Sequence, residues 1–72
     1  MNTRDILNAA IGETLRRARE GRHLSLRDAA EALGMSYVKL HRYEAGTSTV
    51  PAWFLLKASH AYGTTITKLL EG

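Results

Sequence analysis

The chain has 72 residues, of which 44% are hydrophobic and 24% are charged, and its formal net charge is +3 at pH 7. This composition predicts a single folded domain over residues 1–72, near the lower size limit at which a hydrophobic core suffices without cross-links. Because the sequence contains no cysteine, a disulfide framework and a thiolate metal site are excluded. We recognise neither a signal peptide nor an apolar run approaching the roughly 20 residues of a membrane span, and we expect a cytoplasmic protein.

The hydrophobic pattern predicts helices throughout the chain and no strand. In the first helix, expected from Thr3 to Glu20 and ended by Gly21, the apolar residues recur every three or four positions. They are Leu7, Ala10, Ile11, Leu15 and Ala18. This spacing places them on one face, which we expect to lie in the core, while Arg16 and Arg17 face outward.

Two short helices separated by a sharp turn are predicted next. Ser25 and Asp28 resemble a capping box, in which the serine accepts a backbone hydrogen bond and the acid lies near the positive end of the helix. Gly34 is able to adopt the positive φ that such a turn often requires, Ser36 caps the second helix, and Gly46 ends it. The helix-turn-helix occupies about residues 25–45, with its first helix over residues 25–33.

The second of these helices has two distinct faces. At about 100° per residue, Leu40 and Tyr43 point toward the core, whereas Val38 and Arg42 point in nearly the opposite direction, with His41 beside them. A helix-turn-helix whose second helix has a polar and basic outer face is the arrangement that enters the major groove of double-stranded DNA. The basic charge of the chain suits this polyanionic partner.

Two further helices are expected after the loop at residues 47–51. Pro51 is placed in the first turn of the fourth helix, near residues 51–62, which stops at Gly63. Two threonines then open a short fifth helix. The apolar residues of these two helices are Phe54, Leu55, Ala58, Tyr62, Ile66, Leu69 and Leu70.

No catalytic or metal-binding pattern is recognisable. His23, His41 and His60 lie far apart along the chain, and no cysteine or acidic cluster completes a metal site. The sequence also lacks a Gly-rich phosphate loop and a nucleophile next to a base. We therefore expect neither enzymatic activity nor a cofactor.

Several of these features together resemble the phage repressor and Cro family, also called the XRE family of helix-turn-helix DNA-binding proteins. The likeness covers about residues 11–71 and includes Leu-Ser-Leu-Arg-Asp-Ala-Ala-Glu-Ala-Leu-Gly-Met-Ser at residues 24–36. It also includes the ending Tyr-Gly-Thr-Thr-Ile-Thr-Lys-Leu-Leu and, before it, Leu40, Tyr43, Glu44 and Gly46. The resemblance implies an all-α fold, a compact five-helix lambda-repressor-like domain with the helix-turn-helix at helices two and three.

The resemblance also indicates which residues meet the bases. The family usually contacts base edges with the first, second and sixth residues of the recognition helix, which here are Tyr37, Val38 and Arg42. The arginine fork matches the O6 and N7 acceptors of guanine, whereas Val38 suits only the methyl group of thymine. His41 is a fourth candidate, and a solvated side chain is the alternative for Arg42.

Contacts with DNA phosphates are expected around the turn and in the following loop. In the family a glutamine commonly opens helix two and holds a phosphate, but Leu26 stands at that position here, and the neighbouring Arg27 is able to replace it. The candidates are Ser36, Lys39, Arg27, Thr47 and Ser48. Ser36 also serves as a helix cap, and Lys39 has water as its alternative partner.

Arg19 and Glu44 each lie at the margin of an apolar face. In the family the matching positions form an ion pair that locks the third helix against the first. The resemblance therefore assigns these two residues a structural role.

We interpret the chain as a sequence-specific, Cro-like transcriptional regulator, either a repressor or an activator. One recognition helix reads few base pairs, so a homodimer on a two-fold-related operator is expected. The predicted dimer interface is C-terminal and contains Trp53 (or Phe54), Ile66, Leu69 and Leu70. The alternative is an antitoxin-like or adaptor module that holds a protein partner with the same fold. Leu26 and the weakly basic loop favour that alternative, and the basic outer face of the third helix favours the regulator.

Overall fold

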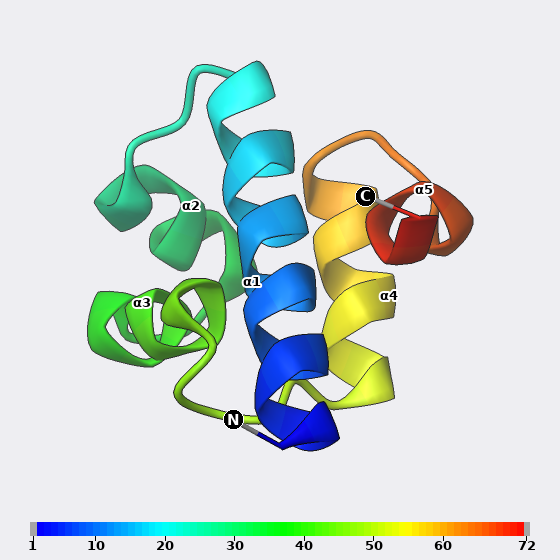
Figure 1. The fold of residues 1–72 in the computed structure, drawn as a ribbon. Coiled ribbons are helices and arrows are strands. Elements are labelled where there is room, and N and C mark those ends of the chain that lie inside the picture. Colours follow the sequence, from blue (N-terminus) through cyan, green and yellow to red (C-terminus); the bar gives the residue numbers. More distant parts are fainter. Residues whose placement is uncertain (1, 72) are drawn as a thin grey trace.

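The structure is a computed structural model that describes residues 2–71. These residues form five helices and no strand, which confirms the all-α fold expected from the sequence. Helix α1 runs through the middle of the molecule, with α2 and α3 on one side and α4 and α5 on the other (Figure 1). The helices are α1 (Thr3–Gly21), α2 (Leu26–Leu33), α3 (Tyr37–Ala45), α4 (Ala52–Ala61) and α5 (Ile66–Glu71).

One hydrophobic core joins the five helices. Its largest fully buried side chains come from every helix and are Leu15, Leu33, Leu40, Phe54 and Leu69. The rings of Tyr43 and Phe54 meet at a centroid distance of 4.7 Å, so α3 and α4 are in direct contact through aromatic packing. The core therefore holds α3 by its inner residues and leaves its other face outside.

The ends of α2 and α3 are built as the sequence predicts. The backbone N–H of Asp28 donates to Ser25 Oγ at 3.0 Å, and the N–H of Lys39 donates to Ser36 Oγ at 3.2 Å. Gly34 ends α2 with φ +68°, and Gly46 ends α3 with φ +77°. Glycine adopts this left-handed conformation at little cost, which confirms the expected turn and the end of the second helix.

Two helix ends differ from the prediction. Gly21 is still part of α1, whose cap is Arg22, and the residue with positive φ is His23 at +58°. Pro51 lies outside the first turn of α4, because its ψ of 156° is extended. Its carbonyl accepts from the N–H of Phe54 at 3.1 Å, so Pro51 is the N-cap and the helix begins one residue later.

The prediction that the apolar face of α1 lies in the core is wrong for its first turns. Leu15 is fully buried and Ile11 is partly buried, but Leu7 is 55% exposed and Ala10 is also exposed. Helix α1 is 19 residues long, and its first turns extend past the core. An apolar surface therefore remains at the N-terminal end of α1.

The crossing of α1 over α3 depends on two glycines. A Cβ atom at Gly12 would lie 2.5 Å from the carbonyl oxygens of Tyr43 and Glu44, and one at Gly46 would lie 2.8 Å from the Cα atom of Ala9. Both distances are far inside van der Waals contact, so only glycine permits this approach of the two backbones. The sequence pattern gave no indication of the role of Gly12.

Candidate nucleic-acid interface

The outer face of α3 is exposed and carries the side chains expected to meet DNA. Tyr37 is 42% exposed and Val38 46% exposed, and the side chains of Lys39, His41 and Arg42 are also exposed. The opposite side of the helix is buried, through Leu40, Tyr43 and Glu44. The rotation of α3 thus agrees with the orientation derived from its apolar positions.

An ion pair fastens α3 to α1. Arg19 Nε donates to Glu44 Oε2 at 2.8 Å and Arg19 Nη2 donates to Glu44 Oε1 at 3.0 Å, in a bidentate arrangement. The side chains are only 11% and 4% exposed. Hydrogen bonding to the carboxylate raises the pKa of Arg19 above its ordinary value, and Arg19 Nη1 also donates to the carbonyl of Leu24 at 2.8 Å. The structure thus brings Arg19 and Glu44 together, and Arg19 also binds the segment that precedes α2 through the carbonyl of Leu24.

Tyr62 lies in the core near this pair, and the charges of Glu44 and Arg19 both affect the pKa of its hydroxyl. Its hydroxyl is buried and has no hydrogen-bond partner among the described residues. Burial, aided by the nearby Glu44 carboxylate, raises the pKa of Tyr62 to about 12. The tyrosine therefore contributes to packing, and its hydroxyl stays protonated.

The candidate phosphate-binding residues lie at both ends of α3. Ser36 and Lys39 are at its N-terminal end, where Ser36 accepts the N–H of Lys39 as the helix cap. At the other end, the backbone N–H and the hydroxyl of Thr47 both donate to the carbonyl of Arg42, at 3.1 and 3.2 Å. Ser48 is half-buried. The hydroxyl proton of Thr47 is therefore already used inside the protein.

The loop after α3 has an additional anchor that the sequence did not reveal. Asn8 Nδ2 on α1 donates to Thr49 Oγ1 at 3.3 Å. The two residues are 41 positions apart in the chain, and polar residues on exposed surfaces carry no pattern that would pair them. This bond links the loop to the first helix.

The basic residues differ in whether they form ion pairs with carboxylates inside the protein. On α1, Arg16 and Arg17 contact the carboxylate of Glu13 at 2.6 and 3.1 Å. By contrast, neither Arg27 nor Arg42 on the helix-turn-helix has a carboxylate partner within residues 2–71. The guanidinium groups of Arg27 and Arg42 are therefore less neutralised by direct contact with a carboxylate than those of Arg16 and Arg17.

The expected dimer interface is only partly available. Leu69 is 2% exposed and belongs to the core, so its assignment to an interface is wrong; its side chain is needed to hold α5 against the domain. Ile66 is partly buried against the same core, and Phe54 is fully buried. Trp53 and Leu70 remain exposed, at 59% and 57%.

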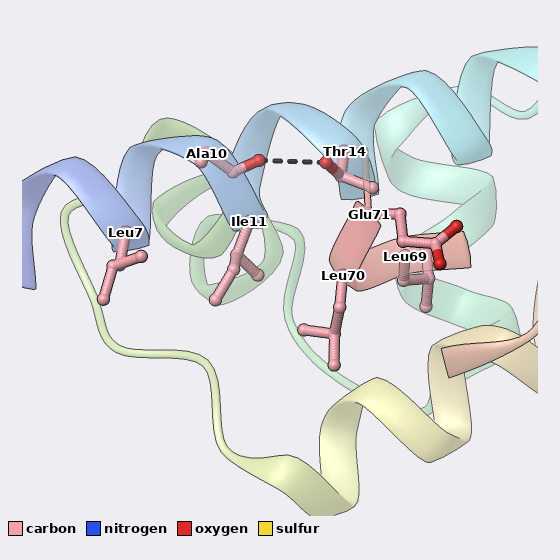
Figure 2. Close-up of a pocket in the computed structure, with 7 residues that line it drawn as sticks. All are labelled: Leu7, Ala10, Ile11, Thr14, Leu69, Leu70 and Glu71. Atoms are coloured by element: carbon pink, nitrogen blue, oxygen red, sulfur yellow. Dashed lines mark hydrogen bonds between the residues drawn. The ribbon is translucent and has the colours of Figure 1, made fainter. Parts of the chain in front are cut away.

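Leu70 borders an open apolar cavity of about 190 Å³ between α1 and α5. Figure 2 shows its side chain pointing into the same space as those of Leu7 and Ile11.

No three potential metal ligands come together among the described residues. No helix in this part of the chain is long and apolar enough to cross a membrane.

The chain belongs to the helix-turn-helix domain family, whose model matches residues 10–71. A crystal structure of the clp gene regulator ClgR from Corynebacterium glutamicum is similar to it, with 32% identity over 90% of this chain and 83% of that chain and a TM-score of 0.86. An HTH_3 family transcriptional regulator from Vibrio cholerae shows 25% identity and a TM-score of 0.86, over 96% of this chain and 39% of that chain. The comparison with curated proteins returned no match. These similarities identify an XRE-type helix-turn-helix domain, a DNA-binding and not a catalytic class of protein.

Proposed function

We propose that this protein is a sequence-specific transcriptional regulator that acts in the cytoplasm by placing α3 in the major groove of DNA. The observation that carries the proposal is the outward face of α3, exposed at Tyr37, Val38, His41 and Arg42 while the ion pair and core hold its inner face. A rigid helix that presents polar and basic side chains is what major-groove reading requires. The similar structures, described as gene and transcriptional regulators, support the same function.

Each exposed residue has a role that follows from its chemistry. Arg42 donates to O6 and N7 of guanine, and Val38 contacts the methyl group of thymine. Tyr37 and His41 read neighbouring base edges through their polar ends. The phosphate contacts that set the register of the helix on the duplex come from Ser36, Lys39 and Ser48, because Thr47 already donates both its N–H and its hydroxyl to the carbonyl of Arg42.

The working form is a homodimer bound to a two-fold-related operator. Two-fold pairing doubles the number of base pairs read and sets the half-sites about one helical turn, roughly 34 Å, apart. Exposed apolar residues on α4, on α5 and on the part of α1 that borders α5 favour this side of the molecule as the interface. Because α4 and α5 lie on the side of α1 opposite α3 (Figure 1), both recognition helices then remain free. These apolar residues are Trp53, Leu70 and Leu7, with Ile66 at the margin.

Selection of bound sequences from random DNA tests the function and the assembly together. We expect an enriched motif with two-fold symmetry and half-sites one helical turn apart. Leu70→Glu changes a residue that is 57% exposed, so it should leave the fold intact and weaken binding to the full operator. Leu69→Glu, in the core, should unfold the domain instead, as circular dichroism would show. Failure to enrich any sequence would refute the regulator, and a monomer that binds one asymmetric half-site tightly would refute the dimer.

A second function is favoured by one observation in the loop. The residues after α3 offer hydroxyls in place of basic groups, and the hydroxyl of Thr47 donates to the carbonyl of Arg42. A loop of this kind should make only weak contacts with the DNA phosphates. Such a loop suits an antitoxin-like or adaptor module whose exposed apolar surface holds a protein partner. A toxin gene next to the gene for this chain would support that function, and a divergent promoter would support the regulator.

A further inference from the structure

Arg27 and Tyr37 connect the two helices of the helix-turn-helix through their side chains. The guanidinium carbon of Arg27, near the start of α2, lies 4.5 Å from the centroid of the Tyr37 ring, at the start of α3. The negative face of an aromatic ring attracts a cation, which restricts a long side chain that otherwise has many conformations. The contact therefore holds the guanidinium beside the N-terminal end of the recognition helix.

Nothing else within residues 2–71 holds the charge of Arg27. Arg27 has no carboxylate partner there, and its position in the first turn of α2 is unfavourable for a cation, since the N-terminal end of a helix is partly positive. Asp28, the next residue, carries the sign of charge that this position favours. The guanidinium of Arg27 is exposed, is positioned by an aromatic ring and costs the helix some stability. These properties favour a role in binding a partner outside the chain.

Resting on the proposed function, we infer that Arg27 determines sequence specificity by donating to O6 and N7 of a guanine, with Tyr37 as its positioning residue. The first residues of a recognition helix are the ones that reach base edges, and the guanidinium lies at that end of α3. A guanidinium over a ring keeps its planar fork of N–H groups available, which lysine does not possess. In addition to the base pairs that α3 reads, one base pair of each half-site is thus read by a residue of α2.

The test compares base preferences, selected from random DNA, of the wild type with those of Arg27→Lys, Tyr37→Phe and Tyr37→Leu. All three changes are at exposed positions, and circular dichroism verifies the fold. Arg27→Lys keeps the charge, so the salt dependence of binding should persist, while the preference for guanine at one position of each half-site should fall about tenfold or more. Tyr37→Leu should lower the preference for guanine at this position although Arg27 is present. Tyr37→Phe, which keeps the ring, should preserve that preference and change only the preference at the neighbouring position that the Tyr37 hydroxyl contacts.

Two outcomes would overturn the inference alone. Base preferences of Arg27→Lys that equal those of the wild type at every position would show that Arg27 meets only phosphate. A loss in Arg27→Lys without any loss at the same position in Tyr37→Leu would remove the positioning role of the ring. A wild-type chain that enriches no sequence would instead refute the proposed function, and this inference with it.

Discussion

Substituting Glu44 by alanine tests whether the ion pair between α1 and α3 holds the recognition helix in place. The pair is bidentate, at 2.8 and 3.0 Å, and its side chains are 11% and 4% exposed. Removing one partner of a buried pair costs about 3–5 kcal/mol because the other charge stays buried without compensation. Arg19 keeps its bond to the carbonyl of Leu24, which places Glu44→Ala near the low end, at about 3 kcal/mol.

That loss is large for a domain of this size. Each kcal/mol lowers the melting temperature by roughly 4–8 °C, so Glu44→Ala should melt roughly 12–24 °C below the wild type. Thermal unfolding followed by circular dichroism measures this. Glu20→Ala is the matched control: Glu20 is 53% exposed and lies 3.7 Å from Arg16, so its loss should stay within about 0.5 kcal/mol.

A double-mutant cycle separates the pair from its surroundings. Arg19→Ala should destabilise at least as much as Glu44→Ala, since it leaves a carboxylate that is 4% exposed and also removes the bond to Leu24. The double variant should lose less than the sum of the single losses, with a coupling energy of at least about 1 kcal/mol. Strictly additive losses would refute the reasoning, because they would show that the two side chains stabilise the fold independently.

Three further outcomes are expected. Gly12→Ala should destabilise the domain by about 1–3 kcal/mol or more, because its Cβ would lie 2.5 Å from two carbonyl oxygens of α3. Gly21→Ala is the control: its Cβ would have nothing within 4 Å, so the variant should be as stable as the wild type or more stable in urea titrations. Equal effects of the two substitutions would contradict the close crossing. The pKa of Tyr62 is raised from 10.0 to about 12, so the folded state keeps the phenol proton that the unfolded state loses, and the unfolding free energy falls as pH rises from 10 toward 12. Tyr62→Phe should therefore flatten the alkaline decline of the unfolding free energy without loss at pH 7, since the buried hydroxyl has no partner among the described residues; an unchanged decline would contradict this. Arg42→Ala should weaken operator binding by about 1–3 kcal/mol and relax the preference at one base pair per half-site, and a binding matrix unchanged at every position would exclude a base contact.

Much of the fold could be predicted from local sequence signals. The caps at Ser25 and Ser36 and the glycine turns at Gly34 and Gly46 are interactions between residues a few positions apart, and the structure confirms them. The outward direction of Arg42 followed from helical periodicity in the same way, because the angle between residues of one helix is fixed by its geometry. Such information is local, and a sequence displays it directly.

The tertiary structure decided what depends on the distance between helices. Whether an apolar residue is core or surface depends on whether another helix reaches it: Leu69 is buried while its neighbour Leu70 is exposed, and Leu7 of α1 is exposed although it shares the apolar spacing of Leu15. The close crossing at Gly12 and the contact of Arg27 with Tyr37 likewise join separate helices. By itself the sequence determined the helices, the caps and glycine ends of α2 and α3, and the outer face of α3, since these follow from periodicity and near neighbours. Only the packed structure decided which apolar side chains remain exposed and which side chains meet across the turn, because those contacts depend on the relative positions of helices that no local pattern specifies.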